Sequence, residues 1–163
     1  MFSTIQDFIN TWSHESDSTV KLLKSLSDES LRQQVYPGGR TLGRLANHLV
    51  ETLTEMPSKL QLGIQEEHAR FSQVAEIVSN YERCSRQLVE TLKAKWTDAD
   101  LKKSNNLYGD EWLNAFSLQV LVMHQCHHRG QMTVLMRQAG LVVPGIYGPA
   151  KEEWVSYGMT PLE

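Results

Sequence analysis

The sequence contains few cysteines and no long apolar stretch. Its two cysteines, Cys84 and Cys126, are too few for a disulfide scaffold, and neither belongs to a CxxC pair. We therefore expect a protein of the reducing cytoplasm. The apolar runs are only a few residues long, far short of the roughly 20 residues that span a bilayer. The first residues also lack the basic and apolar regions of a signal peptide, so we expect neither secretion nor a membrane partner.

Strong charge of one sign is also missing. The 163 residues carry a net charge of -3 with histidine neutral, and no stretch of Lys and Arg is dense enough to indicate a nucleic-acid partner. A composition of 40% hydrophobic and 21% charged residues is that of an ordinary folded protein and argues against long disorder. The length is typical of one domain, which we predict over residues 1–163.

Strand-like alternation is weak throughout, whereas apolar residues recur three or four positions apart in four stretches. These stretches predict helices over residues 5–26, 42–56, 74–95 and 111–138. Thr41 stands at the N-cap of the second helix and Pro57 near its end. We interpret 58–70 and 97–110 as connections, the latter with an extended piece at Leu107 and Tyr108. The predicted fold is all-α, a four-helix bundle with a short C-terminal helix around Trp154.

The fourth predicted helix is apolar almost all the way round. Most of its length carries apolar side chains with little polar surface between them. A helix of this kind is either central in a bundle or lies at a subunit interface. We therefore expect a homodimer.

The most informative feature is the concentration of histidine on this helix. His124, His127 and His128 are half of the chain's six histidines. A helix advances about 100° per residue, so His124 and His128, four apart, project from one face and can hold one cation. A third ligand from another helix is needed, because two imidazoles rarely hold a metal alone. His48 qualifies, because it lies in the apolar stripe of the second helix.

Spacing alone leaves two alternatives open. His127 lies three residues from His124 and also shares a helix face with it, so periodicity does not exclude His127 as a ligand. Histidines on an apolar face can equally be hydrogen-bonded core residues without a metal. His14 and His68 lie among polar residues and are interpreted as solvated.

Several neighbours of the histidines have two interpretations each. Arg129 would pair with a carboxylate or a substrate anion, or form a surface salt bridge. Gln131 would hydrogen-bond a ligand or its water, or lie on the helix surface. Glu51 and Glu55 lie on the same helix as His48 and would orient a ligand or face water. Cys126 points about 200° away from the two ligands and is expected to pack as a small apolar residue.

Two segments together resemble a known family. The run 40–49, RTLGRLANHL, is followed about 75 residues later by the run 124–131, HQCHHRGQ. This combination resembles the DinB-like family of four-helix-bundle metalloenzymes, over essentially the whole chain, and the segment 144–154 is similar to the C-terminal segment of one branch. The resemblance implies His48, His124 and His128 as metal ligands. It leaves His127 as a residue beside the ligands or on the surface. The choice between His127 and His128, which spacing leaves open, is therefore decided by the resemblance.

The resemblance also implies a chemistry. Three imidazoles leave a coordination position open, as in catalytic zinc sites, and relatives of this family use such a metal to activate low-molecular-weight thiols. We expect zinc or nickel, a small-molecule substrate or thiol, and a thiol-dependent transferase or a related hydrolase or isomerase. The family habit also favours a homodimer. The alternative is a non-catalytic metal-binding stress-response bundle that acts through protein interaction or metal sequestration. A cavity above the metal lined by Trp12, Tyr108 or Tyr147 would favour the enzyme.

Overall fold

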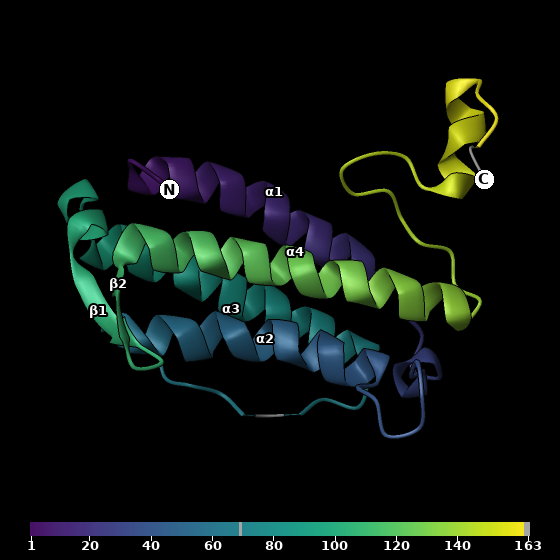
Figure 1. The fold of residues 1–163 in the computed structure, drawn as a ribbon, viewed down its shortest axis with the longest axis horizontal. Coiled ribbons are helices and arrows are strands. Elements are labelled where there is room, and N and C mark those ends of the chain that lie inside the picture. Colours follow the sequence, from purple (N-terminus) through teal and green to yellow (C-terminus); the bar gives the residue numbers. More distant parts are fainter. Residues whose placement is uncertain (69, 162–163) are drawn as a thin grey trace.

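The computed structural model describes residues 1–68 and 70–161. Four long helices run side by side along the long axis of the molecule, with the N-terminus at one end and the C-terminal segment at the other (Figure 1). The all-α prediction and the four-helix bundle are thereby confirmed. The long helices are α1 (Ile5–Leu23), α2 (Leu42–Lys59), α3 (Val74–Lys95) and α4 (Asn114–Gln138), and the shorter elements are the 3-10 helices η1 (Ser30–Arg32), η2 (Asp98–Lys102) and η3 (Lys151–Tyr157) and the strands β1 (Ser104–Leu107) and β2 (Asp110–Leu113).

The helix ends follow local signals with small departures from the prediction. Thr41 caps α2 as expected, since its hydroxyl accepts a 3.0 Å hydrogen bond from the backbone N–H of Arg44. Helix α1 ends at Leu23 instead of residue 26, because the next backbone N–H groups form shorter turn bonds. Helix α2 continues two residues past Pro57. The predicted C-terminal helix is present as the 3-10 helix η3.

The prediction missed a small β-hairpin before the fourth helix. Strands β1 and β2 pair antiparallel, with Ser104 opposite Leu113 and Leu107 opposite Asp110. Tyr108 and Gly109 form the two-residue turn, with φ of 58° and 97°, as the right-handed twist of a tight hairpin requires. Helix α4 therefore begins at Asn114 and not at residue 111. Four-residue strands with few apolar residues give no alternation strong enough to recognise.

Buried polar contacts tie the helices to one another. The Trp12 indole N–H donates a 3.0 Å bond to the Ser85 hydroxyl and joins α1 to α3. Gly43 allows η1 to lie against α2, since a Cβ atom at this position would lie 3.0 Å from the carbonyl oxygen of Leu31. The close approach at Gly43 fixes the start of α2 against η1, and α2 carries one of the three candidate ligands.

Helix α4 is not enclosed, contrary to the idea of a central helix. Its inner faces pack against α1 and α2, but Phe116, Met123 and Val134 are 39%, 57% and 54% exposed. They lie on an outer face of the helix, which leaves apolar surface in contact with solvent. Within the described part of the chain, no helix is both long and apolar enough to cross a membrane.

Candidate metal centre

The structure brings His48, His124 and His128 together between α2 and α4. The Nε2 atom of His124 lies 2.9 Å from Nε2 of His48 and 3.1 Å from Nε2 of His128. One nitrogen atom from each of the three rings lies within 4.8 Å of the other two. A cluster of this kind could hold a metal ion.

The hydrogen bonds behind the rings determine which nitrogens are free. Nδ1 of His128 lies 2.7 Å from the amide oxygen of Gln131, which can only accept, so Nδ1 carries the hydrogen. Nδ1 of His48 faces the Glu51 carboxylate at 3.5 Å and is likewise the protonated nitrogen. The Nε2 atoms of His48 and His128 then each carry a lone pair, and both face Nε2 of His124. A single hydrogen on His124 can bond to only one of them. A cation at the point where the nitrogens converge removes this conflict, so the donor set fits a metal.

The site also favours neutral imidazoles, the form that binds metals. Burial lowers the pKa of His124 to about 4, with further lowering by His128 and His48. Burial is also the main cause that lowers the pKa of His48, with Arg44 next. The pKa of His128 is lowered by burial, although the bond to Gln131 opposes this.

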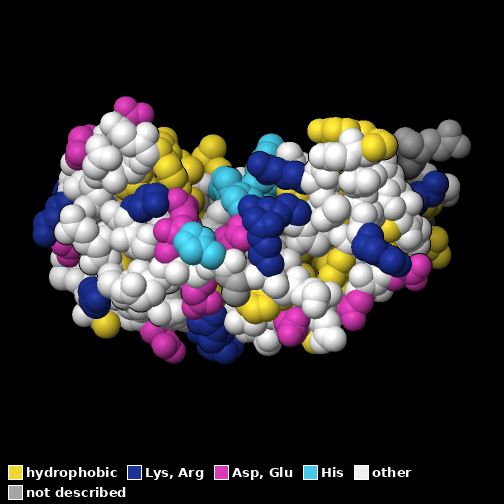
Figure 2. Space-filling view, turned by 90° about the horizontal axis from the view of Figure 1, so that it is seen from below, with side chains coloured by type: hydrophobic (Ala, Val, Ile, Leu, Met, Phe, Trp, Pro, Cys, Tyr) yellow, Lys and Arg dark blue, Asp and Glu magenta, His cyan; other side chains and the backbone are white. Residues whose placement is uncertain are grey.

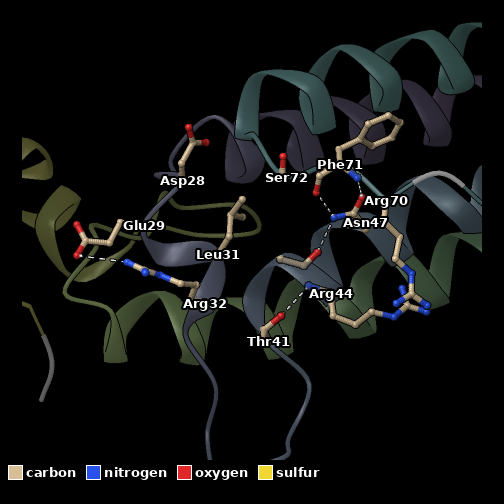
Figure 3. A pocket seen from close by; sticks show the side chains of 11 residues that line it. Asp28, Glu29, Leu31, Arg32, Thr41, Arg44, Asn47, Arg70, Phe71 and Ser72 are labelled. Atoms are coloured by element: carbon tan, nitrogen blue, oxygen red, sulfur yellow. Dashed lines mark hydrogen bonds and ion pairs between the residues drawn. The ribbon is translucent and has the colours of Figure 1, made fainter.

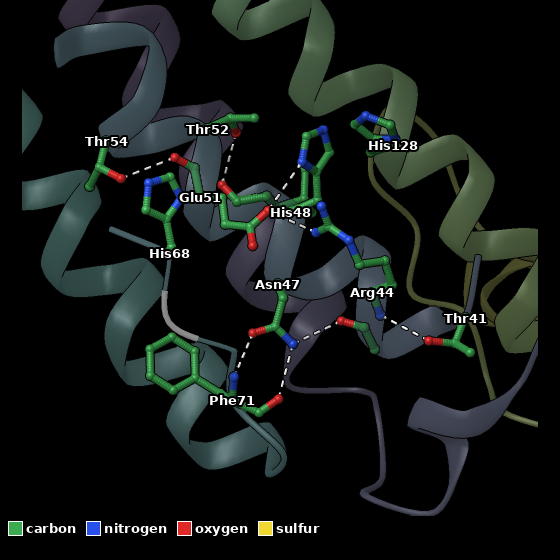
Figure 4. A network of polar contacts seen from close by, with 12 residues as sticks. Thr41, Arg44, Asn47, His48, Glu51, Thr52, Thr54, His68, Phe71 and His128 are labelled. Carbon is green, nitrogen blue, oxygen red and sulfur yellow. Dashed lines mark hydrogen bonds and ion pairs between the residues drawn. The ribbon is translucent and has the colours of Figure 1, made fainter. Parts of the chain in front are cut away.

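Helix α2 supplies a row of carboxylates beside the histidines. Glu51 accepts a 2.8 Å bond from Arg44 in addition to facing His48. Figure 4 shows His48, Glu51 and Arg44 close together on α2, with His128 opposite on α4. One turn further along, Glu55 binds Lys59 at 2.9 Å and accepts a 2.8 Å bond from the Tyr108 hydroxyl of the hairpin. Both carboxylates therefore already have cationic partners.

Not every residue predicted near the site lies there. Gln131 contacts His128, and Glu51 contacts His48. His127 is exposed, and its ring stacks edge-on against His128 with centroids 4.9 Å apart, outside the group of three converging nitrogens. His14 and His68 are exposed, as expected for solvated residues.

Arg129 pairs with a carboxylate, which confirms one of the interpretations given for it, and the surface salt bridge is wrong. Its guanidinium donates to the backbone carbonyl oxygen and carboxylate of Glu15 and to the Thr19 hydroxyl on α1, so it is directed away from the three histidines. The side chains of Arg129 and Glu15 are only 3% and 8% exposed. Burial alone would raise the pKa of Glu15, but hydrogen bonds from Arg129 and Tyr147 hold it below its ordinary value. One helical step of 100° separates Arg129 from His128, which is enough to direct it toward α1 while His128 faces α2.

Cys126, which is partly buried, and the exposed Tyr147 contact this buried pair from outside. The Cys126 thiol lies 3.3 Å from the Glu15 carboxylate and 2.9 Å from the Tyr147 hydroxyl, so it has polar partners and is not the apolar packing residue expected. Tyr147 donates a 2.7 Å bond to Glu15. Trp12 is fully buried in the core. Of the three aromatic residues proposed to line a substrate cavity, only Tyr108 has a partner, Glu55, on the helix face that carries His48.

The histidines lie in a depression on one face of the molecule. Figure 2 shows cyan histidine side chains at the bottom of this depression, with dark blue Lys or Arg side chains beside them. Yellow apolar side chains lie on its two rims. Next to His128, a hollow of about 440 Å³ is lined by Gln131 together with Arg40 and apolar residues of α2, α4 and the loop before α2. None of the three histidines lines this hollow, but His48 and His124 are themselves partly exposed, so solvent reaches the site.

A separate hollow lies at the start of α2. Its volume is about 610 Å³, and it is lined by residues of η1, α2 and the segment around Phe71, as Figure 3 shows. Asn47 spans it, since its side chain both donates to and accepts from the backbone of Phe71 at 3.0 and 2.7 Å. This contact anchors the segment before α3 beside His48. None of the three histidines lines this hollow.

One positioning residue escaped the sequence analysis. Gln125 follows His124 and is fully buried, with bonds to Tyr81 on α3 and to Leu49 and Thr52 on α2. It therefore fixes α4 against the helix that carries His48. A polar residue within an otherwise apolar helix is what could have identified Gln125 in the sequence. We interpreted the polar residues of this region only as possible metal ligands and their neighbours.

Comparison with known proteins places this geometry among relatives. The model of the DinB family matches residues 1–161. YrdA, an uncharacterized protein of Bacillus subtilis (strain 168), is 46% identical over 162 residues, which cover 98% of this chain and 97% of YrdA.

Two solved structures are also similar. The crystal structure of a DinB-like protein from Bacillus cereus ATCC 10987 superposes with a TM-score of 0.86 at 43% identity and covers 90% of this chain and 100% of that chain. A DinB-like protein of Bacillus subtilis, YjoA, superposes with a TM-score of 0.70 at 15% identity, over 88% of this chain and 99% of its own, and shows the shared fold.

Proposed function

The chain belongs to the DinB family, and from this and the site we propose that His48, His124 and His128 bind one divalent metal ion in a metal-dependent enzyme. The observation that supports this most is the convergence of three Nε2 atoms, with the His48 ring held by Glu51 and the His128 ring by Gln131. Such outer partners orient metal-binding imidazoles and make them better donors. Zinc or nickel is the ion we propose, since imidazole ligands suit both.

The proposed reaction is a thiol-dependent transfer, or a related hydrolysis or isomerisation. A divalent ion held by three imidazoles lowers the pKa of a thiol or water at its open position, so that the anion exists at neutral pH. The chain itself supplies the depression that admits a small molecule and the ion pairs that hold Glu51 and Glu55 in place. The two cysteines are unpaired, in keeping with the cytoplasmic location that we propose.

Metal content tests the ligand assignment. Protein purified without added metal is expected to carry close to one divalent ion per chain by elemental analysis. His128→Ala loses the ion, whereas the matched variant His127→Ala, one position away on the exposed surface, retains it. Full occupancy in His128→Ala would overturn the assignment.

A thermal-shift experiment tests the thiol. A ligand that binds only the folded state raises the melting temperature, so metal-loaded protein is expected to melt higher with glutathione or cysteine, and His128→Ala is expected to show no shift. The alternative is a metal-binding stress-response bundle without turnover. No shift with any thiol would favour that alternative.

A further inference from the structure

Arg40, at the edge of the histidine site, has no ion-pair or side-chain hydrogen-bond partner among the described residues. Arg40 lies directly before Thr41, in the loop that a backbone bridge between Gln34 and Thr41 connects to the start of α2. Its side chain is exposed, and within the described residues no carboxylate lies within ion-pair distance of it. The loop is therefore anchored while its guanidinium is available to a ligand.

Arg40 borders a hollow that adjoins the histidine site through Gln131, although none of the three histidines lines it. It lines the hollow of about 440 Å³ together with Gln131, whose amide holds His128. Its positive charge is among the causes that lower the pKa values of both His48 and His128. Arg40 is therefore a cation close to the site that, unlike Arg44, has no carboxylate partner among the described residues.

The other charges around the site are already balanced. Glu51 is paired with Arg44, and Glu55 with Lys59. Three neutral imidazoles add no charge, so a bound divalent ion and Arg40 leave the depression strongly positive. An excess of positive charge in a partly enclosed hollow attracts an anion and disfavours a cationic ligand.

The wall around Arg40 is apolar. Val35, Tyr36 and Leu45 from the α2 side face Val134 and Leu135 of α4 across the hollow. One guanidinium edge matches the two oxygens of one carboxylate, and apolar neighbours strengthen such a pair.

We propose that Arg40 binds the carboxylate of a small substrate with an apolar body, while another donor atom of the same molecule occupies the open position beside His48, His124 and His128. The proposal rests on the metal site proposed above. It assigns Arg40 as a specificity-determining residue, separate from the groups that hold the ion.

Cobalt(II)-loaded protein provides a test that does not need turnover, because thiolate binding to cobalt produces a charge-transfer absorption. The probes are mercaptoacetate, which carries a carboxylate, and 2-mercaptoethanol, which has a hydroxyl instead. In Arg40→Gln, the Kd for mercaptoacetate is expected to rise about tenfold, the effect of losing one hydrogen bond between charged groups. The Kd for 2-mercaptoethanol is expected to remain the same. Arg40→Lys should restore part of the affinity.

Arg86→Gln is the matched control, since Arg86 is also exposed and without an ion pair in the described residues but lies on α3, beside a hollow it shares with Trp12. It should bind both probes as the unchanged protein does. Equal affinity of Arg40→Gln and the unchanged protein for mercaptoacetate would overturn the role of Arg40 and leave the metal site standing. Failure of the unchanged protein to bind cobalt would overturn the metal site and, with it, this proposal.

Discussion

The Gln125 side-chain amide donates a 3.1 Å hydrogen bond to the carbonyl oxygen of Leu49. Leu49 follows His48 in sequence, and Gln125 follows His124, so this bond joins the backbone next to one candidate ligand to the side chain next to another. A second bond from the same amide to the Thr52 hydroxyl, at 3.0 Å, fixes the same register between α2 and α4. The distance between the His48 and His124 rings depends on this register.

Replacement of Gln125 by Met is expected to destabilise the protein and weaken metal binding. The change keeps the side-chain volume but leaves the buried Tyr81 hydroxyl without its partner, and a buried polar group without a bond costs about 1–3 kcal/mol. Urea unfolding of the metal-free protein and metal titration measure the two effects. Gln138→Met, at the exposed end of α4, is the control. Unchanged metal affinity in Gln125→Met would show that the register does not depend on this residue.

The stability of the metal-free protein is expected to fall as the pH is lowered from about 7 to 5. The folded-state pKa of His124 is about 4, below its ordinary value of 6.5. In this pH range the His124 side chain of the unfolded chain binds a proton that the folded chain does not bind. The contribution of His124 to the free energy of unfolding is therefore fully present above pH 6.5 and is lost as the pH falls toward its folded-state pKa of about 4. Melting temperatures across this range measure the effect.

His124→Asn should flatten this pH profile, because it removes the group with the largest difference between the two states. The same substitution at His14, on the exposed surface of α1, provides the control. A profile that is equally steep in His124→Asn would contradict the role of His124. Carboxylates such as Glu15 lose their contribution only at lower pH, so the window separates them from the histidines.

Arg129→Met is expected to destabilise the fold by about 3 kcal/mol or more, since it leaves the buried Glu15 carboxylate without its cation. Glu15→Gln combined with Arg129→Met should recover part of this loss, because both charges are then gone. Chemical unfolding of Arg129→Met, Glu15→Gln and the double variant measures the coupling. Metal content per folded chain should stay unchanged, as the pair lies on the face of α4 toward α1. Loss of metal in a folded Arg129 variant would contradict this separation.

We also propose that the chain forms a homodimer through the exposed apolar face of α4. Light scattering should then give twice the 18.6 kDa of one chain. Met123→Glu places a charge on that face, away from the hollow beside Arg40, and should shift the mass toward the monomer. Val155→Glu, at a more exposed apolar residue on η3, should not. A monomeric mass of the unchanged protein at moderate concentration would contradict the proposal.

The amino-acid pattern alone determined the bundle and the positions of the three histidines. Helical periodicity repeats over 18 to 25 residues, so α1 to α4 were predictable in number and near their observed bounds. The spacing of His124 and His128 required only local helix geometry. The hairpin was not predictable, because its strands are four residues long and gain their stability from packing at the end of the bundle.

Only the tertiary structure decided which side chains meet across helices. The rotation of α4 about its axis directs His128 toward α2 and Arg129 toward α1, and this rotation is set by contacts such as Gln125 with Leu49. The pairing of Arg129 with Glu15, 114 residues apart, has no local signal. The position of Arg40 near the histidines has no local signal either, because it depends on how the loop before α2 folds back against the start of that helix. Local periodicity specifies which face of a helix a residue occupies, whereas the packing of whole helices specifies what that face contacts.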